Sequence, residues 1–211
     1  MSKDSISMSV IRRLPRYYRF LSELNEQNVE RISSTKLAEI MNVTASQVRQ
    51  DLNCFGGFGQ QGYGYSVAQL KDEIKKILGL NNNYNAILIG AGNLGKAVAK
   101  HMNFDKLGFE LIACFDNNPN KVGEMLNDIS VKADNEIEDF CKHNQIDAAF
   151  LCIPKICVEG VLDQLYSYGI KNYWNFSHYD INTRYNDTVV ENVHLSDNLM
   201  TLCYRMNNYS K

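Results

Sequence analysis

The first 26 residues show the apolar spacing of a helix. Apolar side chains recur there every three or four residues, which predicts an amphipathic helix over about residues 8–26. They are Val10, Leu14, Tyr17, Tyr18, Leu21 and Leu24. Pro15 lies inside this stretch, and a proline is tolerated in the first turn of a helix but not in its interior. We therefore expect a helix that begins at Pro15, with a helix kinked there as the alternative.

Two shorter helices separated by a tight turn are predicted next. The first covers residues 35–41, the turn is at residues 42–43, and the second helix continues to about Cys54. Thr44 and Gln47 have the spacing of a capping box, in which two residues cap the start of a helix reciprocally.

The second of these helices has a polar outer face. This arrangement is typical of a helix-turn-helix, whose second helix enters the major groove of DNA, where Arg and Gln side chains can bond guanine or adenine edges. A solvated face on an ordinary helical domain is the alternative. The candidate DNA-binding residues of this helix are Thr44, Ser46, Gln47, Arg49 and Gln50.

Residues 55–65 are rich in glycine and aromatic residues. The segment FGGFGQQGYGY allows close backbone approach, and two short strands with a tight tip would form a β-hairpin wing. Gln60 and Gln61 would lie at the tip, within reach of DNA phosphate or the minor groove. A nucleotide-binding loop is the rival interpretation, but the Lys-Ser/Thr of a P-loop does not follow. The front of the chain is therefore predicted to be a winged helix-turn-helix domain.

A different pattern begins after a helix over residues 67–78 and an Asn-rich linker at 81–83. The apolar strand 86–89 is followed directly by G-x-G-x-x-G and then by the small residues of a helix. In this setting the glycines permit the turn, admit a pyrophosphate and let the helix pack on the strand, while the helix N-terminus offers N–H groups to the phosphates. The candidate cofactor-binding residues here are Gly90, Ala91, Gly92, Asn93, Leu94 and Gly95.

An acidic residue follows at the distance that a dinucleotide site requires. Asp116 ends the predicted strand 109–115 and lies 21 residues beyond Gly95. A carboxylate at this place accepts hydrogen bonds from the adenosine ribose and disfavours a 2′-phosphate, so NAD⁺ and NADH are expected over their phosphorylated forms. A Rossmann-like fold without a ligand is the alternative.

Helices and strands continue to alternate beyond Asp116. Helices are predicted over about 135–143 and 155–168, and strands over 146–153, 172–176 and 189–194. Such alternation predicts an α/β fold, here a Rossmann domain with a doubly wound parallel sheet. Because strand ends border the ligand cleft of these sheets, Ile153, Pro154 and Asn175 join the cofactor candidates.

A last helix over about residues 196–206 carries apolar residues on one side. A lone helix after a finished domain must bury that side, and a partner subunit is a reasonable place for it. We therefore divide the chain into a winged-helix domain (1–82), a Rossmann domain (83–194) and a C-terminal dimerisation helix (195–211).

Charge differs between the two parts of the chain. The 211 residues have a formal net charge of −2, but residues 1–80 carry 11 basic and 8 acidic residues, and residues 81–211 carry 11 and 16. A mildly basic front part beside an acidic back part indicates two domains with different partners.

Several classes of protein are disfavoured by composition. No apolar run approaches the roughly 20 residues of a membrane span, and the first residues lack the apolar core of a signal peptide, so a cytoplasmic location is expected. The six cysteines form no C-x-x-C pair, so we expect buried, reduced thiols and no metal site. The four histidines are scattered, and none lies beside a nucleophile. Catalysis is therefore not expected.

Two alternative functions remain. One is a small NAD-dependent oxidoreductase whose front domain serves dimerisation, which would need a catalytic acid or base near the nicotinamide. The other is a nucleotide-binding interaction module without DNA, which the glycine-rich wing disfavours.

Taken together, the motifs resemble those of the Rex-type redox-sensing transcriptional repressors. They are RRLPRYYR at 12–19, ISSTKLAEIMNVTASQVRQDL at 32–52, FGGFGQQGYGY at 55–65, GAGNLG at 90–95, CFD at 114–116 and WNF at 174–176. The resemblance implies a homodimer with domain-swapped terminal helices, whose two winged helices bind an inverted-repeat operator in double-stranded DNA. It also implies that NADH binding closes the dimer and releases the DNA, whereas NAD⁺ competes and favours the DNA-bound state.

The resemblance also implies roles for single residues. Arg19 matches an arginine that couples the winged helix to the cofactor domain. His101 and His194 stand where the family usually has a Tyr and an Asp of a polar network linked to NADH, so the geometry and pH dependence of the trigger are expected to differ. Much of the family has a basic residue at the positions of Gln50 and Gln61, so the operator sequence is expected to differ too.

Overall fold

The computed structural model describes residues 6–60 and 63–209. The chain divides into two compact units, Met1–Asn81 and Asn82–Lys211, and each has its own hydrophobic core. The boundary falls in the Asn-rich segment that the sequence marks as a linker.

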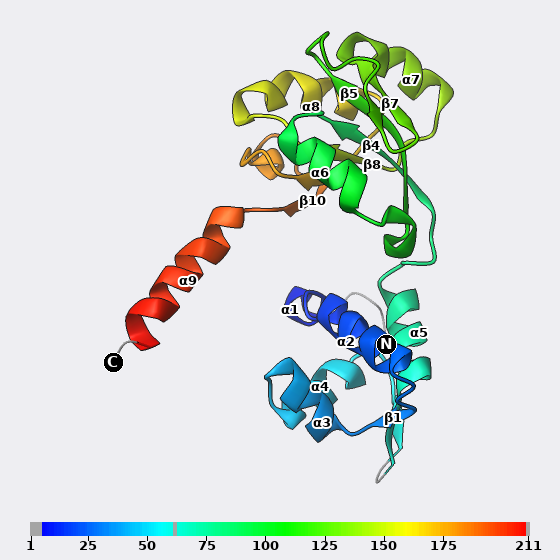
Figure 1. Cartoon of the computed structure of the whole chain (residues 1–211), viewed down its shortest axis with the longest axis vertical. Helices are drawn as coiled ribbons and strands as arrows, with labels where there is room; N and C mark the ends of the chain where they lie inside the picture. Colours follow the sequence, from blue (N-terminus) through cyan, green and yellow to red (C-terminus); the bar gives the residue numbers. More distant parts are fainter. Residues whose placement is uncertain (1–5, 61–62, 210–211) are drawn as a thin grey trace. The chain divides into compact units, whose positions relative to one another are not determined.

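The first unit combines helices with a small antiparallel sheet (Figure 1). In chain order its elements are α1 (Met8–Ile11), α2 (Leu14–Glu26), β1 (Arg31–Ile32), α3 (Ser34–Met41), α4 (Ala45–Asn53), β2 (Gly59–Gln60), β3 (Gly64–Ser66) and α5 (Val67–Ile77). The strands pair in the order β1-β3-β2, and the β2–β3 hairpin is the wing that the glycine-rich segment predicts. Helices α3 and α4 form the helix-turn-helix.

Local caps define the helix-turn-helix. The hydroxyl of Ser33 accepts the N–H of Lys36 at the start of α3, and the hydroxyl of Thr44 accepts the N–H of Gln47 at the start of α4, both at 3.1 Å. Asn42 ends α3 in the left-handed conformation, with φ of 50°. A turn of this kind lets the second helix follow after three intervening residues.

The predicted helix start at Pro15 is confirmed to within one residue, because α2 begins at Leu14 with Pro15 in its first turn. Two details were not predicted. The residues before α2 form a separate short helix. The capping box is only half formed, because the Gln47 side chain donates to the carboxylate of Asp51 at 2.8 Å. A charged acceptor makes the stronger hydrogen bond, so the amide turns along the helix instead of back to Thr44.

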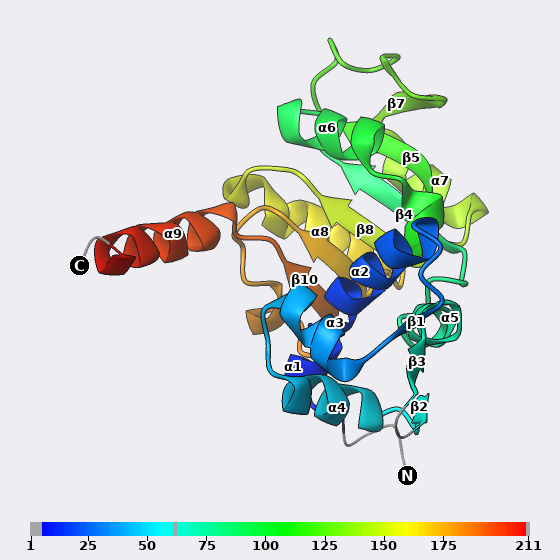
Figure 2. The same cartoon turned by 60° about the horizontal axis from the view of Figure 1, so that its bottom comes forward.

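The second unit is a doubly wound α/β domain followed by a helix (Figures 1 and 2). Its elements are β4 (Tyr84–Ile89), α6 (Asn93–His101), η2 (Phe104–Leu107), β5 (Phe109–Asp116), β6 (Met125–Leu126), β7 (Ile129–Ala133), η3 (Asp134–Glu136), α7 (Ile137–His143), β8 (Ala148–Leu151), η4 (Lys155–Cys157), α8 (Val158–Ser167), β9 (Asn172–Asn175), η5 (Ile181–Thr183), β10 (Val189–Asn192) and α9 (Leu195–Tyr209). The strand order is β10-β9-β8-β4-β5-β7-β6, parallel from β10 to β7, with β6 antiparallel. The Rossmann fold is confirmed; the β6–β7 hairpin was not expected.

Alternate residues of the central strand β4 face opposite sides of this sheet. Ile87 and Ile89 belong to the core that includes side chains of α7 and α8. Leu88 belongs to the core that includes side chains of α6. Helices therefore lie on both faces, which explains why the strand is an unbroken apolar run rather than an alternating one.

The cysteines are less buried than expected. All six are free thiols, but Cys54, Cys157 and Cys203 are exposed. Apolar neighbours in sequence do not decide burial, because a helix turns neighbouring residues toward different sides. Cys203 is exposed for a different reason, because every described residue of α9 is exposed.

Substitution of Gly64 tests the geometry of the wing. Gly64 has φ of 69°, and a Cβ there would lie 2.5 Å from the carbonyl oxygen of Ile32. Gly57 has open space around it. We expect Gly64→Ala to lower the free energy of unfolding of the first unit by at least about 1 kcal/mol, measured by urea denaturation, because the left-handed backbone disfavours Cβ. Gly57→Ala is the matched control, and equal effects of the two would contradict this account.

Candidate functional site

Glycines shape the loop between β4 and α6. Gly90 has φ of 99°, and a Cβ there would lie 2.6 Å from the carbonyl oxygen of Cys152. A Cβ on Gly95 would lie 1.9 Å from the carbonyl oxygen of Gly90, so α6 reaches the loop only because this residue is glycine. A Cβ on Gly92 would enter open space, with Lys121 Nζ as its nearest neighbour at 4.0 Å. A ligand can therefore approach the backbone at Gly92.

Asp116 is a buried carboxylate at the end of β5, 6% exposed. Its Oδ2 accepts the N–H of Ala91 at 2.7 Å and the ammonium of Lys121 at 3.0 Å, and its Oδ1 accepts the N–H of Asn118 at 2.8 Å. Burial opposes ionisation, but these hydrogen bonds and the Lys121 charge outweigh it and lower the pKa of Asp116. The carboxylate is therefore charged at neutral pH and tied to the glycine loop.

A cavity of about 480 Å³ lies at the C-terminal ends of the parallel strands. Of the predicted cofactor residues, those that line it are Gly90, Gly92, Asn93, Leu94, Asp116, Ile153 and Pro154. Sequence reasoning missed Lys121, Asn118 and Cys157, which also line it. The signal that could have revealed Lys121 is its position in the loop that follows Asp116, five residues along the chain.

The other predicted cofactor residues support the cavity from behind. Ala91 is fully buried and holds Asp116 through its N–H, and Gly95 packs against the loop. Asn175 is also fully buried, and its amide donates to the carbonyl of Tyr179 at 2.8 Å and to Asn192 at 2.7 Å. It does not line the cavity that the described residues form.

The outer face of α4 carries the predicted DNA-binding side chains. Ser46, Arg49 and Gln50 are exposed, and Gln47 is half-buried. The Arg49 guanidinium donates to Ser34 at 3.0 Å and to Ser46 at 3.3 Å, so it lies across the starts of α3 and α4. Thr44 is exposed and caps the helix.

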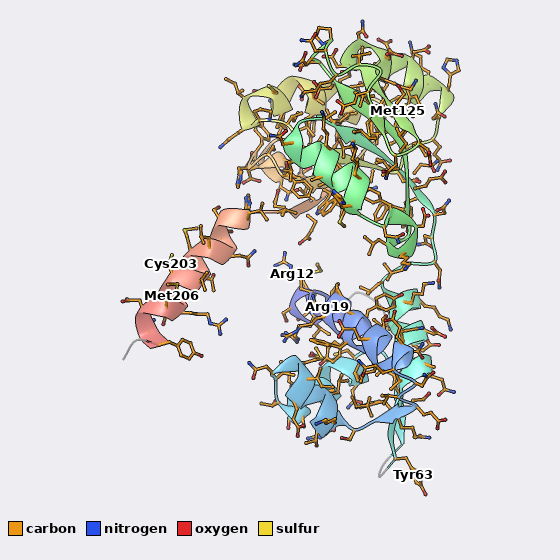
Figure 3. The ribbon with its side chains drawn as sticks, viewed as in Figure 1. Arg12, Arg19, Tyr63, Met125, Cys203 and Met206 are labelled. Atoms are coloured by element: carbon orange, nitrogen blue, oxygen red, sulfur yellow. The ribbon has the colours of Figure 1, made fainter. Side chains whose placement is uncertain are left out.

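The wing and the arginines of α2 present further polar groups. Gln60 is in strand β2, and Gln61 lies outside the described residues. Figure 3 shows Tyr63 extending from the wing, Arg19 on α2 and Arg12 at the end of α1, just before α2. Arg12, Arg16 and Arg19 are all exposed. Their spacing gives this helical region a basic stripe.

Asp51, which the sequence did not single out, is the buried acid of the first unit, 1% exposed. Arg13 donates to it through Nε and Nη2, both at 2.7 Å, and the Tyr17 hydroxyl donates at 3.0 Å. Gln47 donates at 2.8 Å. Burial again opposes ionisation, and the hydrogen bonds from Arg13, Gln47 and Tyr17 outweigh it, so the pKa of Asp51 is lowered.

The residues expected to couple the two units have different surroundings. The Arg19 guanidinium lies over the ring of Phe20, 5.2 Å from its centroid. His101 is exposed at the end of α6. His194 pairs with His178, with 2.7 Å between their Nδ1 atoms, so one ring donates and the other accepts.

Known proteins resemble the chain over nearly its whole length. One family model, described as the N-terminus of putative DNA-binding proteins, matches residues 5–53, and another, described as a CoA binding domain, matches residues 81–179. The redox-sensing transcriptional repressor Rex of Thermoanaerobacter pseudethanolicus is 53% identical over 205 residues, which cover 97% of this chain and 91% of that protein. The Rex of Clostridioides difficile is 50% identical, covering 98% of each. The chain belongs to the Rex family.

Solved structures of a Rex-family repressor have the same fold. The crystal structure of RSP in complex with β-NAD⁺ and operator DNA matches with a TM-score of 0.89 at 52% identity, covering 97% of this chain and 94% of that one. The structure of RSP with β-NADH also gives 0.89, at 49% identity, covering 98% and 96%. The predicted combination of a winged-helix and a Rossmann unit is confirmed. The similar Rex proteins are named as repressors, which removes support from the oxidoreductase alternative.

Within residues 6–60 and 63–209, no helix is both long and apolar enough to cross a bilayer. Nor do three or more His, Cys, Asp or Glu side chains gather there as a metal site would require.

The lowered pKa of Asp51 predicts acid sensitivity of the Rex winged helix. A folded-state pKa below the ordinary value of about 4 means that the ionised network stabilises the fold above that pH, and that this stability is lost as the pH falls toward the folded-state pKa. We expect Asp51→Asn to flatten this loss in urea unfolding measured from about pH 2 to pH 7. Asp72→Asn, at an exposed site on α5, is the control. An unchanged pH profile in Asp51→Asn would refute the assignment.

Proposed function

We propose that this protein is a transcriptional repressor that senses the ratio of NADH to NAD⁺ and leaves its DNA operator when NADH binds. The observation that carries the proposal is the presence, in one chain, of a dinucleotide cleft with a buried acid and of a helix-turn-helix with a polar outer face. Solved structures of RSP contain NAD⁺ with operator DNA in one complex and NADH in another, which supports both ligands. Since such a protein acts on DNA, we place it in the cytoplasm.

The residues of the cleft fit a dinucleotide. The open space at Gly92 and the N–H groups at the start of α6 suit a pyrophosphate. Asp116 Oδ1 accepts one hydrogen bond from the described residues and keeps a further lone pair for a ribose hydroxyl. Lys121 holds the same carboxylate and adds a positive charge beside the phosphates. The cofactor residues remain Gly90 to Gly95, Asp116, Ile153, Pro154 and Asn175.

DNA recognition is assigned to α4 and the wing. In the proposal α4 enters the major groove with Thr44, Ser46, Gln47, Arg49 and Gln50 toward the bases and phosphates. Gln60 and Gln61 of the wing contact the adjoining backbone or minor groove. Because the charge of the front part is modest, affinity depends on these contacts and on two copies binding together.

Release of DNA requires a difference in affinity between two states of the protein. The cleft must bind NADH more tightly in the DNA-free state than in the DNA-bound state. A change from 1:99 to 99:1 in the ratio of these states requires about 5.5 kcal/mol of such preference. Arg19, His101 and His194 are the residues proposed to link the cleft to the winged helix.

The proposal includes a homodimer formed through α9. Every described residue of this helix is exposed, and one side is apolar, with Leu195, Leu199, Leu202 and Met206 in a stripe. Figure 3 shows Cys203 and Met206 on this helix. The Rossmann unit also has an apolar cavity of about 320 Å³, lined by Phe104, Phe150 and Trp174 among others. We propose that α9 of one copy is exchanged with that of a second copy and packs on such an apolar surface, which two winged helices on an inverted repeat require.

Titration with NADH tests the sensing function. A DNA fragment selected from a random pool is bound by the protein, and we expect NADH to weaken binding by about 5-fold to 150-fold in gel-shift assays. Gly92→Val fills the space for the pyrophosphate, so its DNA complex should persist in NADH. Gly160→Val, at an open position on α8, should respond like the wild type. Indifference of the wild-type complex to NADH would contradict the proposal.

A charge on the apolar stripe of α9 tests the dimer. We expect Leu199→Glu to convert the protein to a monomer in sedimentation velocity, because a buried carboxylate without a partner is strongly unfavourable. Asn208→Glu adds the same charge on the other side of the helix and should leave a dimer. Retention of NADH binding shows that the variants are folded. A Leu199→Glu dimer would exclude this interface.

A further inference from the structure

Asp51 holds one end of a side chain on the outer face of the proposed recognition helix. Its carboxylate is 1% exposed and accepts from Arg13, Tyr17 and Gln47. Asp51 itself is too deeply buried to contact DNA. Gln47, four residues earlier on α4, is half-buried and reaches from the carboxylate toward the outer face.

The chemistry of this pair fixes the direction of the Gln47 amide. An ionised carboxylate only accepts hydrogen bonds, so the Gln47 group that faces it must be the NH₂. The opposite arrangement would place the amide oxygen against a negative charge. The Nε2 atom accordingly lies 2.8 Å from Asp51 Oδ1. No donor among the described residues engages Gln47 Oε1.

We propose that Asp51 is a positioning residue that sets the base preference of this protein, by holding the Gln47 amide so that its oxygen is presented to the DNA. This inference rests on the proposed DNA-binding function. A freely rotating glutamine can offer either end to a base, whereas a fixed one can offer its oxygen only to a hydrogen-bond donor. In the major groove those donors are the amino groups of adenine N6 and cytosine N4. Gln47 thus selects adenine or cytosine on the strand it contacts and rejects guanine or thymine.

The hydrogen bonds to Asp51 also explain why the Gln47 amide keeps one orientation. Arg13 binds Asp51 with two hydrogen bonds from α2, and Tyr17 adds a third from the next turn of the same helix. The carboxylate is therefore fixed by a neighbouring helix rather than by Gln47. Loss of the charge removes the reason for the amide to keep one direction, because an Asn at position 51 could either donate to Gln47 or accept from it.

The test of this proposal measures base preference at each position of the DNA site, in addition to total affinity. DNA sequences are selected from a random pool by each of four proteins: wild type, Asp51→Asn, Gln47→Ala and the double variant. Binding titrations then compare the affinity of each protein for the four bases at every position of the site. We expect one position per half-site at which wild type prefers adenine or cytosine by at least about 5-fold, the range of one base contact. Gln47→Ala and Asp51→Asn should each reduce this preference to less than about 2-fold and leave the preference at other positions unchanged. The double variant should lose no more of the preference than either single variant.

Gln47→Glu provides a second arm in which residue 47 can no longer donate to Asp51, while Arg13 and Tyr17 still do. Every oxygen that this carboxylate can offer to a base is an acceptor, so the preference for adenine or cytosine should persist although total affinity falls. Circular dichroism and NADH binding test whether each variant is folded. If Asp51→Asn is unfolded, the base preferences of Gln47→Glu and Gln47→Ala decide whether the proposal holds. The proposal is overturned if Asp51→Asn weakens all positions equally, if it leaves the preference intact, or if Gln47→Glu abolishes it. Failure of the wild type to bind any DNA would instead refute the proposed function.

Discussion

The close contact between Gly95 and the carbonyl oxygen of Gly90 is the constraint on which the Rossmann unit depends. A single extra carbon at Gly95 would lie 1.9 Å from that oxygen. Because no carbon is there, the first turn of α6 packs directly on the loop that ends β4. The same approach places the N–H of Ala91 against Asp116 and leaves Gly92 facing open space. One steric requirement therefore fixes the helix, the acid and the opening for a phosphate together.

Each unit then orders its recognition surface around one buried carboxylate. Asp116 is held by backbone N–H groups and Lys121, and Asp51 is held by Arg13, Tyr17 and Gln47. A buried charge is tolerated only when several donors surround it, so those donors must keep their places. The consequence is that side chains and backbone at both surfaces are fixed before a ligand arrives. Preorganisation of this kind lowers the entropy lost on binding.

Local rules account for what could be predicted. The glycine fingerprint, the spacing of Asp116 and the cap at Thr44 each depend on a few neighbouring residues, and the structure has all three. The features that sequence reasoning did not predict involve competition for a buried carboxylate. Gln47 turns to Asp51 instead of Thr44, and Lys121 shares Asp116 with the glycine loop. Asn175 is buried, and its amide donates to the carbonyl of Tyr179 and to the side chain of Asn192, which no spacing rule indicates.

Backbone sterics and side-chain periodicity act over short distances, so the type of each unit and the residues of the glycine loop follow from the amino-acid sequence, whereas α1 and the β6–β7 hairpin do not. The tertiary structure alone decided which carboxylates are buried and which side chains satisfy them. Asp51 looks like an ordinary polar residue of an exposed helix until α2 packs against it and brings Arg13 and Tyr17 within hydrogen-bonding distance. Such partners come from separate segments, and packing, rather than spacing along the chain, brings them together.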